Sequence, residues 1–295
     1  RASFTYSPVP FDKPWSAVGM NVGRKPGPVL QRVPLGRTGL AVSRLGFGAF
    51  KIGRNQVTKY PSAYALPSEA EVDQLLNRVL DLGINLIDTA PAYGRSEELI
   101  GRFLAHRRAE FVLSTKVGET FYDGKSHFDF SAAGVRASVV QSLRLLRTDW
   151  LDLVFVHSNG LDLRVMQESE VVPTLQRLKE TGSVRAVGFS AKTVAGSKAA
   201  LDWADAIMVE YHALKRDHED VMAHATCAGT AVIVKKGLAS GHLPPDQAVQ
   251  AVLGNMHVTS MLVGSLNIQH MQRNVEIAST ILLSLPVTCC RHPAA

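Results

Sequence analysis

Four polar residues stand out because their types and spacing suit the transfer of a proton. They are the acid Asp88, the phenol Tyr93 five residues later, the ammonium of Lys116 and the imidazole of His157. A phenol with a pKa near 10 is protonated at neutral pH, and it gives up its proton more readily beside a positive charge. We expect Lys116 to lower the pKa of Tyr93, and Asp88 to keep the lysine charged and aimed. His157 would bind the substrate oxygen or share the proton.

Each of these residues also has a structural interpretation. Asp88 and Lys116 could form an ion pair at the rim of a sheet, and Tyr93 could be an aromatic residue of a turn. A histidine that ends a strand is often a satisfied core residue, but the spacing of His157 from the other three favours a role beside them.

The segment from Gly83 to Gly101 contains the elements that position the first two residues. An apolar run at residues 84–87 predicts a buried strand that ends at Asp88. A Pro-Ala-Tyr-Gly turn follows, and Ser96 begins an amphipathic helix. Strand, polar residues and helix in this order are typical of βα proteins, which carry their chemistry at the carboxyl ends of the strands.

The same alternation continues along the chain. Lys116 follows Asp88 by 28 residues, and His157 follows Lys116 by 41, so each gap is about one βα unit. Apolar runs predict strands at residues 42–50, 84–87, 111–116, 151–156, 184–189, 206–211, 231–234 and 261–263. Eight repeats, with no Gly-x-Gly-x-x-Gly after the first strand, favour an α/β fold with a single closed (β/α)8 TIM barrel over an open Rossmann sheet.

The remaining segments are predicted to lie around this barrel. Residues 1–30 are rich in Pro, Gly and Ser and read as an extended N-terminal arm, while residues 33–40 read as a β-hairpin. We expect the barrel to span residues 31–285, with a short C-terminal tail at 286–295. A loop at 121–130 is the best candidate for a lid over the pocket.

Composition excludes several other classes of protein. The apolar fraction of 46% is that of a globular chain, and no run approaches the length of a membrane helix. The net charge of +6 indicates either a generally basic surface or a basic cleft for a phosphorylated ligand. No basic run with interleaved aromatics indicates nucleic acid. Three cysteines without metal-ligand spacing predict no metal site and a reducing, cytoplasmic location.

The motifs around these residues resemble those of the aldo-keto reductases. They read Asp-Thr-Ala-Pro-Ala-Tyr-Gly at Asp88, Ser-Thr-Lys-Val-Gly at Lys116, Phe-Val-His at His157, and Val-Gly-Phe-Ser at Ser190. The resemblance covers roughly residues 30–283. It implies a barrel capped at its amino-terminal end by the hairpin, a nicotinamide cofactor, and catalytic roles for Asp88, Tyr93, Lys116 and His157.

The resemblance also implies residues around the nicotinamide, where this chain departs from the family pattern. Ser190 matches a residue that binds the carboxamide, but Ala191 and Met208 replace the usual asparagine and glutamine. Lys235 or Lys236 takes the place of the aromatic that stacks on the ring; the stem of Lys235 could cover a ring face while its charge reaches a phosphate. The resemblance also places a strand end under the nicotinamide ring. Here it consists of Gly48, Ala49 and Phe50, and the Phe50 ring would line the substrate pocket.

Two further segments are implied to hold the phosphates and the adenosine. The loop that resembles the pyrophosphate loop contains Gly237, Leu238, Ser240 and Gly241. The start of the last helix, with its free amides and positive dipole end, suits the adenosine 2′-phosphate. Its matching residues are Gly264, Ser265, His270, Arg273 and Asn274. The basic residues among them favour NADPH over NADH.

The sequence therefore predicts an NADPH-dependent oxidoreductase that reduces aldehydes or ketones to alcohols, with Tyr93 as general acid. Two alternatives stay open. One is an NAD(P)-dependent aldose 1-dehydrogenase, and the other is a non-catalytic regulatory subunit that senses the cofactor. The expected partner is a small carbonyl substrate, and we expect neither nucleic acid nor membrane. The protein is predicted to be a monomer or a weak homo-oligomer.

Overall fold

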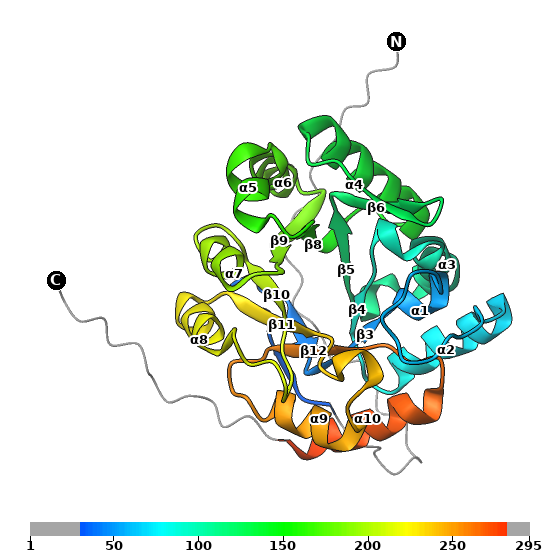
Figure 1. Cartoon of the computed structure of the whole chain (residues 1–295). Helices are drawn as coiled ribbons and strands as arrows, with labels where there is room; N and C mark the ends of the chain where they lie inside the picture. The colour runs from blue at the N-terminus through cyan, green and yellow to red at the C-terminus, as the bar shows by residue number, and fades with distance from the viewer. Residues whose placement is uncertain (1–29, 282–295) are drawn as a thin grey trace.

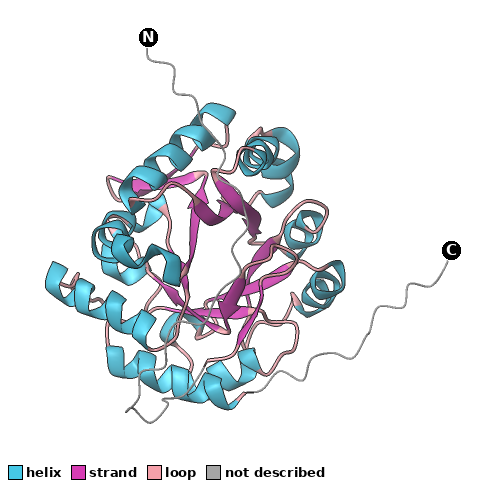
Figure 2. Ribbon diagram, turned by 180° about the vertical axis from the view of Figure 1, so that it is seen from behind, coloured by secondary structure: helices cyan, strands magenta, loops and turns pink. Residues whose placement is uncertain are grey.

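Eight parallel strands close into a barrel in a computed structural model that describes residues 30–281. The strands lie inside a ring of helices (Figures 1 and 2). In order around the barrel they are β3 (Leu45–Gly48), β4 (Leu86–Asp88), β5 (Val112–Val117), β8 (Leu151–His157), β9 (Val184–Ser190), β10 (Ala206–Glu210), β11 (Ala231–Lys235) and β12 (Ser260–Val263). Met261 of β12 pairs with Leu45 of β3 and closes the ring. The predicted (β/α)8 barrel is confirmed.

The helices that cover the barrel follow the strands in sequence. They are α1 (Phe50–Gly53), α2 (Glu69–Asp81), α3 (Ser96–Leu104), α4 (Ala132–Leu146), α5 (Asp162–Glu168), α6 (Val171–Glu180), α7 (Val194–Ala200), α8 (Glu219–Ala228), α9 (Pro245–Leu253) and α10 (Ile268–Thr280). The first long helix starts at a capping box, because Ser68 accepts from the amide of Glu71 while the Glu71 carboxylate accepts from the amide of Ser68. Short 3₁₀ turns add η1 (Pro91–Tyr93), η2 (Ala105–Glu110) and η3 (Ala239–Gly241).

A hairpin of β1 (Arg32–Pro34) and β2 (Ala41–Ser43) lies at the amino-terminal end of the barrel. Its apolar residues Val33, Leu35 and Val42 are buried in one cluster with inward residues of the barrel strands. The prediction of one strand over residues 42–50 was wrong, because the chain turns at Arg44 between β2 and β3. The buried guanidinium of Arg44 donates to the carbonyls of Leu253 and Val258 and so fixes that turn.

The predicted arm and tail lie largely outside the described residues. The structure describes nothing before residue 30 or after residue 281, so the arm at 1–30 and the tail at 286–295 stay predictions. Within residues 30–281, no helix has the length and apolar character to cross a membrane.

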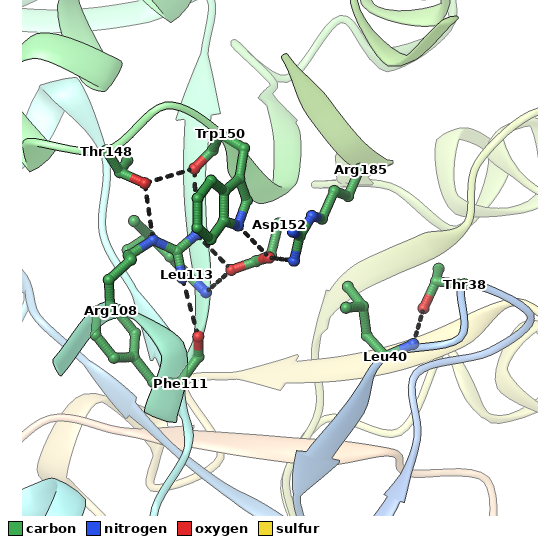
Figure 3. Close-up of polar contacts among 9 residues, drawn as sticks. All are labelled: Thr38, Leu40, Arg108, Phe111, Leu113, Thr148, Trp150, Asp152 and Arg185. Carbon is green, nitrogen blue, oxygen red and sulfur yellow. Dashed lines mark hydrogen bonds and ion pairs between the residues drawn. The ribbon is translucent and has the colours of Figure 1, made fainter. Parts of the chain in front are cut away.

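A polar network ties β8 and β9 to the segment before β5 at the amino-terminal side (Figure 3). The buried carboxylate of Asp152 accepts from Arg108 at 2.6 Å, from the amide of Leu113 at 2.9 Å, from the Trp150 indole at 3.1 Å and from Arg185 at 3.0 Å. Both guanidiniums also lie within 4.8 Å of the centre of the Trp150 ring. These contacts compensate the buried negative charge of Asp152 at the end of the barrel opposite the carboxyl ends of the strands.

The segment after β5 forms a second hairpin, of β6 (Glu119–Tyr122) and β7 (Lys125–Phe128). The sequence predicted a loop and lid here, but the strands pair over four positions, and the rings of Tyr122 and His127 stack 3.7 Å apart. The guanidinium of Arg54 lies 3.2 Å from the centre of the Phe121 ring. Through Arg54 the hairpin is attached to the chain that follows α1.

Candidate active site

The structure brings the four predicted catalytic side chains together at the carboxyl ends of the barrel strands. Asp88 ends β4, Lys116 lies in β5, His157 ends β8 and Tyr93 lies in η1 just after β4. The ammonium of Lys116 lies 4.7 Å from the centre of the Tyr93 ring, and the rings of Tyr93 and His157 are 6.2 Å apart, edge to face. Neighbouring parallel strands thus deliver Asp88, Lys116 and His157 to one rim, as the spacing of the sequence predicted, and the turn after β4 adds Tyr93.

Lys116 is held as a cation in a fully buried position. Its Nζ lies 2.7 Å from Oδ2 of Asp88 and donates to the carbonyl of Thr89 at 2.7 Å. The other oxygen of Asp88 accepts from the hydroxyl of Ser114 at 2.9 Å. Burial alone would lower the pKa of Lys116, but attraction to Asp88 and Tyr93 outweighs it and raises that pKa. The lysine therefore stays charged at neutral pH.

The predicted lowering of the Tyr93 pKa was wrong. Burial raises this pKa most, and the negative charge of Asp88 raises it further, while Lys116 acts in the opposite direction without prevailing. The ammonium of Lys116 is evident from the sequence, but the loss of water around the phenol depends on packing that the sequence does not show. Tyr93 is a protonated hydrogen-bond donor at neutral pH. Burial makes the charged phenolate less stable, and the positive charge of Lys116 offsets only part of this cost.

A partner of His157 was missed in the sequence. Nδ1 of His157 lies 2.8 Å from Oε2 of Glu119, the first residue of β6. Burial would raise the pKa of Glu119, but His157 and Ser126 lower it to about 2, so the carboxylate is ionised. Burial lowers the pKa of His157 by more than Glu119 raises it. The sequence did contain an indication of this contact, because Glu119 follows Lys116 by only three residues and so lies near the same rim of the barrel.

Three of the four groups, Asp88, Tyr93 and His157, line a cavity of about 540 Å³ at the mouth of the barrel, while Lys116 lies buried behind them. Phe50 lines it beside Tyr93, with the ring centres 5.1 Å apart, and Tyr60 packs on Phe50 at 6.2 Å. His218 also lines it. Of the β6–β7 hairpin, only Glu119 among the described residues lines this cavity, so the proposed lid contributes one side chain.

A second cavity of about 440 Å³ continues the first toward α10. The two share lining residues, among them Tyr60, Lys236 and Gly264. The predicted cofactor residues divide between them. The first cavity is lined by Gly48, Phe50, Met208, Lys235, Lys236, Ser240 and Gly264, and the second by Lys236, Gly237, Leu238, Ser240, Gly241, Gly264, Ser265, His270, Arg273 and Asn274. Ala49 and Ser190 are buried and line neither cavity.

The two lysines that the sequence left as alternatives have different surroundings. The ammonium of Lys235 donates to the hydroxyl of Ser190 at 2.8 Å and to the carbonyl of Ala191 at 2.9 Å. It lines only the first cavity, so the expectation that its charge reaches a phosphate is not supported by this conformation. Lys236 lines both cavities and pairs with Glu210 at 2.7 Å. Burial, and then the charge of Lys236, lowers the pKa of Lys235 to about 7.

Two amides at the start of α10 are not free, contrary to the expectation. Asn267 caps this helix, since its side-chain oxygen accepts from the amides of Gln269 at 2.8 Å and His270 at 3.3 Å. A phosphate in the second cavity would therefore rely on side chains as well as on the amides that these caps leave free. Arg273 is available from the same helix, although its guanidinium pairs with Asp246 at 2.7 Å.

These observations fit an elongated dinucleotide better than a compact ligand. The continuous cavities carry basic groups along their length, and the backbone turns sharply at Ser240 and Gly241, with φ of 58° and 94°. In this turn the amide of Gly241 donates to the carbonyl of Leu238 at 2.9 Å, which leaves the amide of Ser240 for an anion. Among residues 30–281, no group of three or more His, Cys, Asp or Glu side chains is placed to hold a metal ion.

The fold and the site define a (β/α)8 barrel with ionisable groups at the carboxyl ends of its strands, and comparison with known proteins gives the family. The model of the aldo/keto reductase family matches residues 44–280. The chain belongs to the aldo/keto reductase family and is therefore an oxidoreductase. This family uses a nicotinamide cofactor.

Named relatives include a dehydrogenase and a reductase. L-galactose dehydrogenase from Arabidopsis thaliana is 29% identical over 285 residues, which cover 82% of this chain and 86% of that protein. NADH-specific methylglyoxal reductase from Escherichia coli K12 is 27% identical over 238 residues, covering 74% and 71%. Among solved structures, a Pseudomonas aeruginosa protein described as an aldo-keto reductase is 45% identical with a TM-score of 0.79, covering 85% of this chain and 95% of that one.

Proposed function

We propose that the protein reduces aldehydes or ketones to alcohols with NADPH, and that Tyr93 is the general acid. The observation that carries this proposal is the position of the Tyr93 phenol on the wall of the first cavity, with the Lys116 ammonium 4.7 Å from its ring. A carbonyl oxygen between Tyr93 and His157 would accept a hydrogen bond from the phenol. When bound, the cofactor supplies the hydride for the carbonyl carbon.

The surrounding residues support proton donation by Tyr93. As the phenol proton moves to the substrate oxygen, negative charge develops on Tyr93, and the fixed charge of Lys116 stabilises it. Asp88 holds the lysine at 2.7 Å, so this charge is in place before the reaction begins. His157 orients the substrate oxygen from the other side of the cavity.

The basic second cavity supports the preference for NADPH. His270 and Arg273 line it, and a cationic side chain there attracts a 2′-phosphate more than a 2′-hydroxyl. Lys236, Ser240 and Gly241 line the part nearer the barrel and suit the pyrophosphate. The 2′-phosphate contact is exposed and partly neutralised by Asp246, so we expect a moderate preference.

A second candidate is the oxidation of a sugar at its first carbon by an aldose 1-dehydrogenase. The first cavity has Glu119, His157, Lys192 and Glu210 on its walls, and these polar side chains suit a hydroxylated substrate. One relative is named an L-galactose dehydrogenase. Since the named relatives are enzymes, catalysis is favoured over the regulatory subunit. The cytoplasmic location and the oligomeric state stay predictions.

Steady-state assays separate the two candidates. Purified protein is given benzaldehyde with NADPH or NADH, and separately a panel of aldoses with NADP⁺ or NAD⁺. The proposal predicts aldehyde reduction with a lower KM for NADPH than for NADH. Turnover of aldoses without measurable reduction of aldehydes at any pH from 5 to 9 would overturn it in favour of the dehydrogenase, and tight cofactor binding without any turnover would favour the regulatory alternative.

A further inference from the structure

The carboxylate of Glu119 is fixed on both of its oxygens. Oε2 lies 2.8 Å from Nδ1 of His157, and Oε1 accepts from the hydroxyl of Ser126 at 2.6 Å. Ser126 belongs to β7, so the hairpin itself orients the carboxylate, with Glu119 paired opposite Phe128 in the β6–β7 ladder. Glu119 therefore contacts His157 from a hairpin outside the barrel, whereas Lys116 lies in a barrel strand and Tyr93 in the turn that follows one.

The short contact determines which nitrogen of His157 carries the proton. Glu119 is ionised and can only accept, and an unprotonated Nδ1 would place a lone pair against a carboxylate oxygen at 2.8 Å. The contact does not have the geometry of a hydrogen bond, but at 2.8 Å a proton on Nδ1 is the arrangement that makes it attractive. Neutral His157 then presents its unprotonated Nε2 to the cavity.

We propose that Glu119 is a positioning residue that makes neutral His157 a hydrogen-bond acceptor toward the substrate oxygen. This inference rests on the proposed function, because it assumes that the reacting oxygen lies between Tyr93 and His157. An alcohol oxygen satisfies both neighbours, since it accepts from the Tyr93 hydroxyl and donates its own proton to Nε2 of His157. A carbonyl oxygen can only accept, so it fits the site only when Nε2 is protonated.

The protonation of His157 therefore selects the reactant. The charged groups that face its ring are Glu119 from β6, Lys116 from β5 and Lys235 from β11, with the phenol of Tyr93 edge-on. Burial, supported by the two lysines, lowers the pKa of His157 below its ordinary 6.5 despite Glu119. At neutral pH the ring is neutral and the site is matched to an alcohol. As the pH falls through that pKa, Nε2 gains a proton and the site is matched to a carbonyl.

The neighbours of Glu119 keep it charged throughout this range. Besides His157 and Ser126, the cation Lys192 lowers its pKa, and Arg54 interacts with it across the cavity. With a pKa of about 2, Glu119 does not titrate near neutral pH. Of this pair, His157 is therefore the group that switches between the two hydrogen-bonding states, with Glu119 as its fixed counter-charge.

Replacement of Glu119 by glutamine tests this role. The amide of Glu119→Gln can meet Nδ1 with either its oxygen or its nitrogen, so neutral His157 can place the proton on either ring nitrogen. The first measurement is ¹⁵N NMR of labelled protein at pH 8, with His157→Asn used to assign the signals. We expect a single tautomer with the proton on Nδ1 in the wild type, and a mixture in the variant.

The second measurement is the pH dependence of kcat/KM for benzaldehyde reduction with NADPH. In the wild type, where the carbonyl needs protonated His157, kcat/KM should fall about tenfold per pH unit above the pKa of His157. In Glu119→Gln the neutral ring can also donate from Nε2, so the profile should be nearly flat from pH 6 to 8. Glu168→Gln makes the same chemical change at an exposed pair with Arg164 and should keep the wild-type profile.

Two results would overturn the inference. One is a wild-type ring with its neutral proton on Nε2, and the other is a Glu119→Gln profile parallel to that of the wild type at a uniformly lower level, as a purely structural role would give. Failure of the proposed function looks different. Wild-type protein would then reduce no carbonyl at any pH, while the NMR measurement would still report whether Glu119 fixes the tautomer.

Discussion

The ammonium of Lys235 lies 2.8 Å from the hydroxyl of Ser190, across the ends of β11 and β9. Its other partner is the carbonyl of Ala191, so neither bond neutralises the positive charge. Lys235 lines the same cavity as Tyr93 and His157, where the proposed reaction needs the nicotinamide ring. A cation on this wall acts differently on the two redox states of the cofactor, because the oxidised ring is positively charged and the reduced ring is neutral.

Lys235→Met should weaken the preference of the protein for NADPH over NADP⁺. The lysine repels the positively charged oxidised ring. We therefore expect the dissociation constant for NADP⁺ divided by that for NADPH to fall roughly fivefold or more in the variant, which corresponds to on the order of 1 kcal/mol. Calorimetric titration with each cofactor measures this without turnover. The exposed Lys198→Met serves as a control for the loss of one positive charge.

The same preference should depend on pH in the wild type. The pKa of Lys235 is lowered to about 7, so its charge is present below pH 7 and is lost as the pH rises. Preference for NADPH should therefore be greatest near pH 6 and decline toward pH 8.5, whereas Lys235→Arg should keep it throughout. Equal ratios in wild type and Lys235→Met at pH 6 would contradict a role of this charge at the ring.

Tyr93→Phe should lower kcat/KM for carbonyl reduction by about 10²–10⁴, because the substrate oxygen loses its proton donor. The ring contact with Phe50 at 5.1 Å does not involve the hydroxyl, so the fold of this wall should persist. The dissociation constant for NADPH should stay within about twofold. Retention of more than a tenth of the wild-type rate would transfer the role of acid from Tyr93 to another donor, of which His157 is the nearest candidate.

The meeting of Asp88, Lys116 and His157 was predictable from the sequence for a simple geometric reason. Residues that end successive parallel strands of a closed barrel point to one rim, so the order of strands and their apolar runs suffices. The boundaries of the first strand were less accurate. The turn at Arg44 depends on carbonyls of Leu253 and Val258, more than 200 residues away in the chain, which no local pattern contains.

The electrostatics of the site could not be predicted because they depend on burial. The direction of the Tyr93 pKa shift is set by the balance of Lys116 against the surrounding protein, and that balance follows from packing rather than from spacing. The contact of Glu119 with His157 requires the path of a hairpin that the sequence suggested only as a loop. The different surroundings of Lys235 and Lys236 could not be predicted, because Lys235 ends β11 whereas Lys236 follows the strand with a positive φ of 55°, and both line the first cavity.

Arg273→Ala should weaken NADPH more than NADH if Arg273 binds the 2′-phosphate. The side chain is more than half exposed and already pairs with Asp246, so we expect a loss for NADPH of only about threefold to tenfold. Asp246→Asn removes the competing carboxylate and should tighten NADPH without changing NADH. Dissociation constants measured at two salt concentrations check the origin of the effect, because an exposed ionic contact weakens at higher salt. Equal losses for both cofactors in Arg273→Ala would exclude the 2′-phosphate contact.

Asp152→Ala should be strongly destabilising although it lies away from the proposed chemistry. The substitution leaves the buried guanidinium of Arg108 without its counter-charge and removes the acceptor of the Trp150 indole and the Leu113 amide (Figure 3). Breaking a buried ion pair on one side costs about 3–5 kcal/mol of the free energy of unfolding. Urea unfolding followed by tryptophan fluorescence measures the loss, with Glu168→Gln as an exposed control within about 0.5 kcal/mol of the wild type.

Under native conditions the variant should bind NADPH normally, because the network lies at the end of the barrel opposite the cavities. A stable Asp152→Ala with impaired cofactor binding would mean that the amino-terminal network shapes the site rather than the fold.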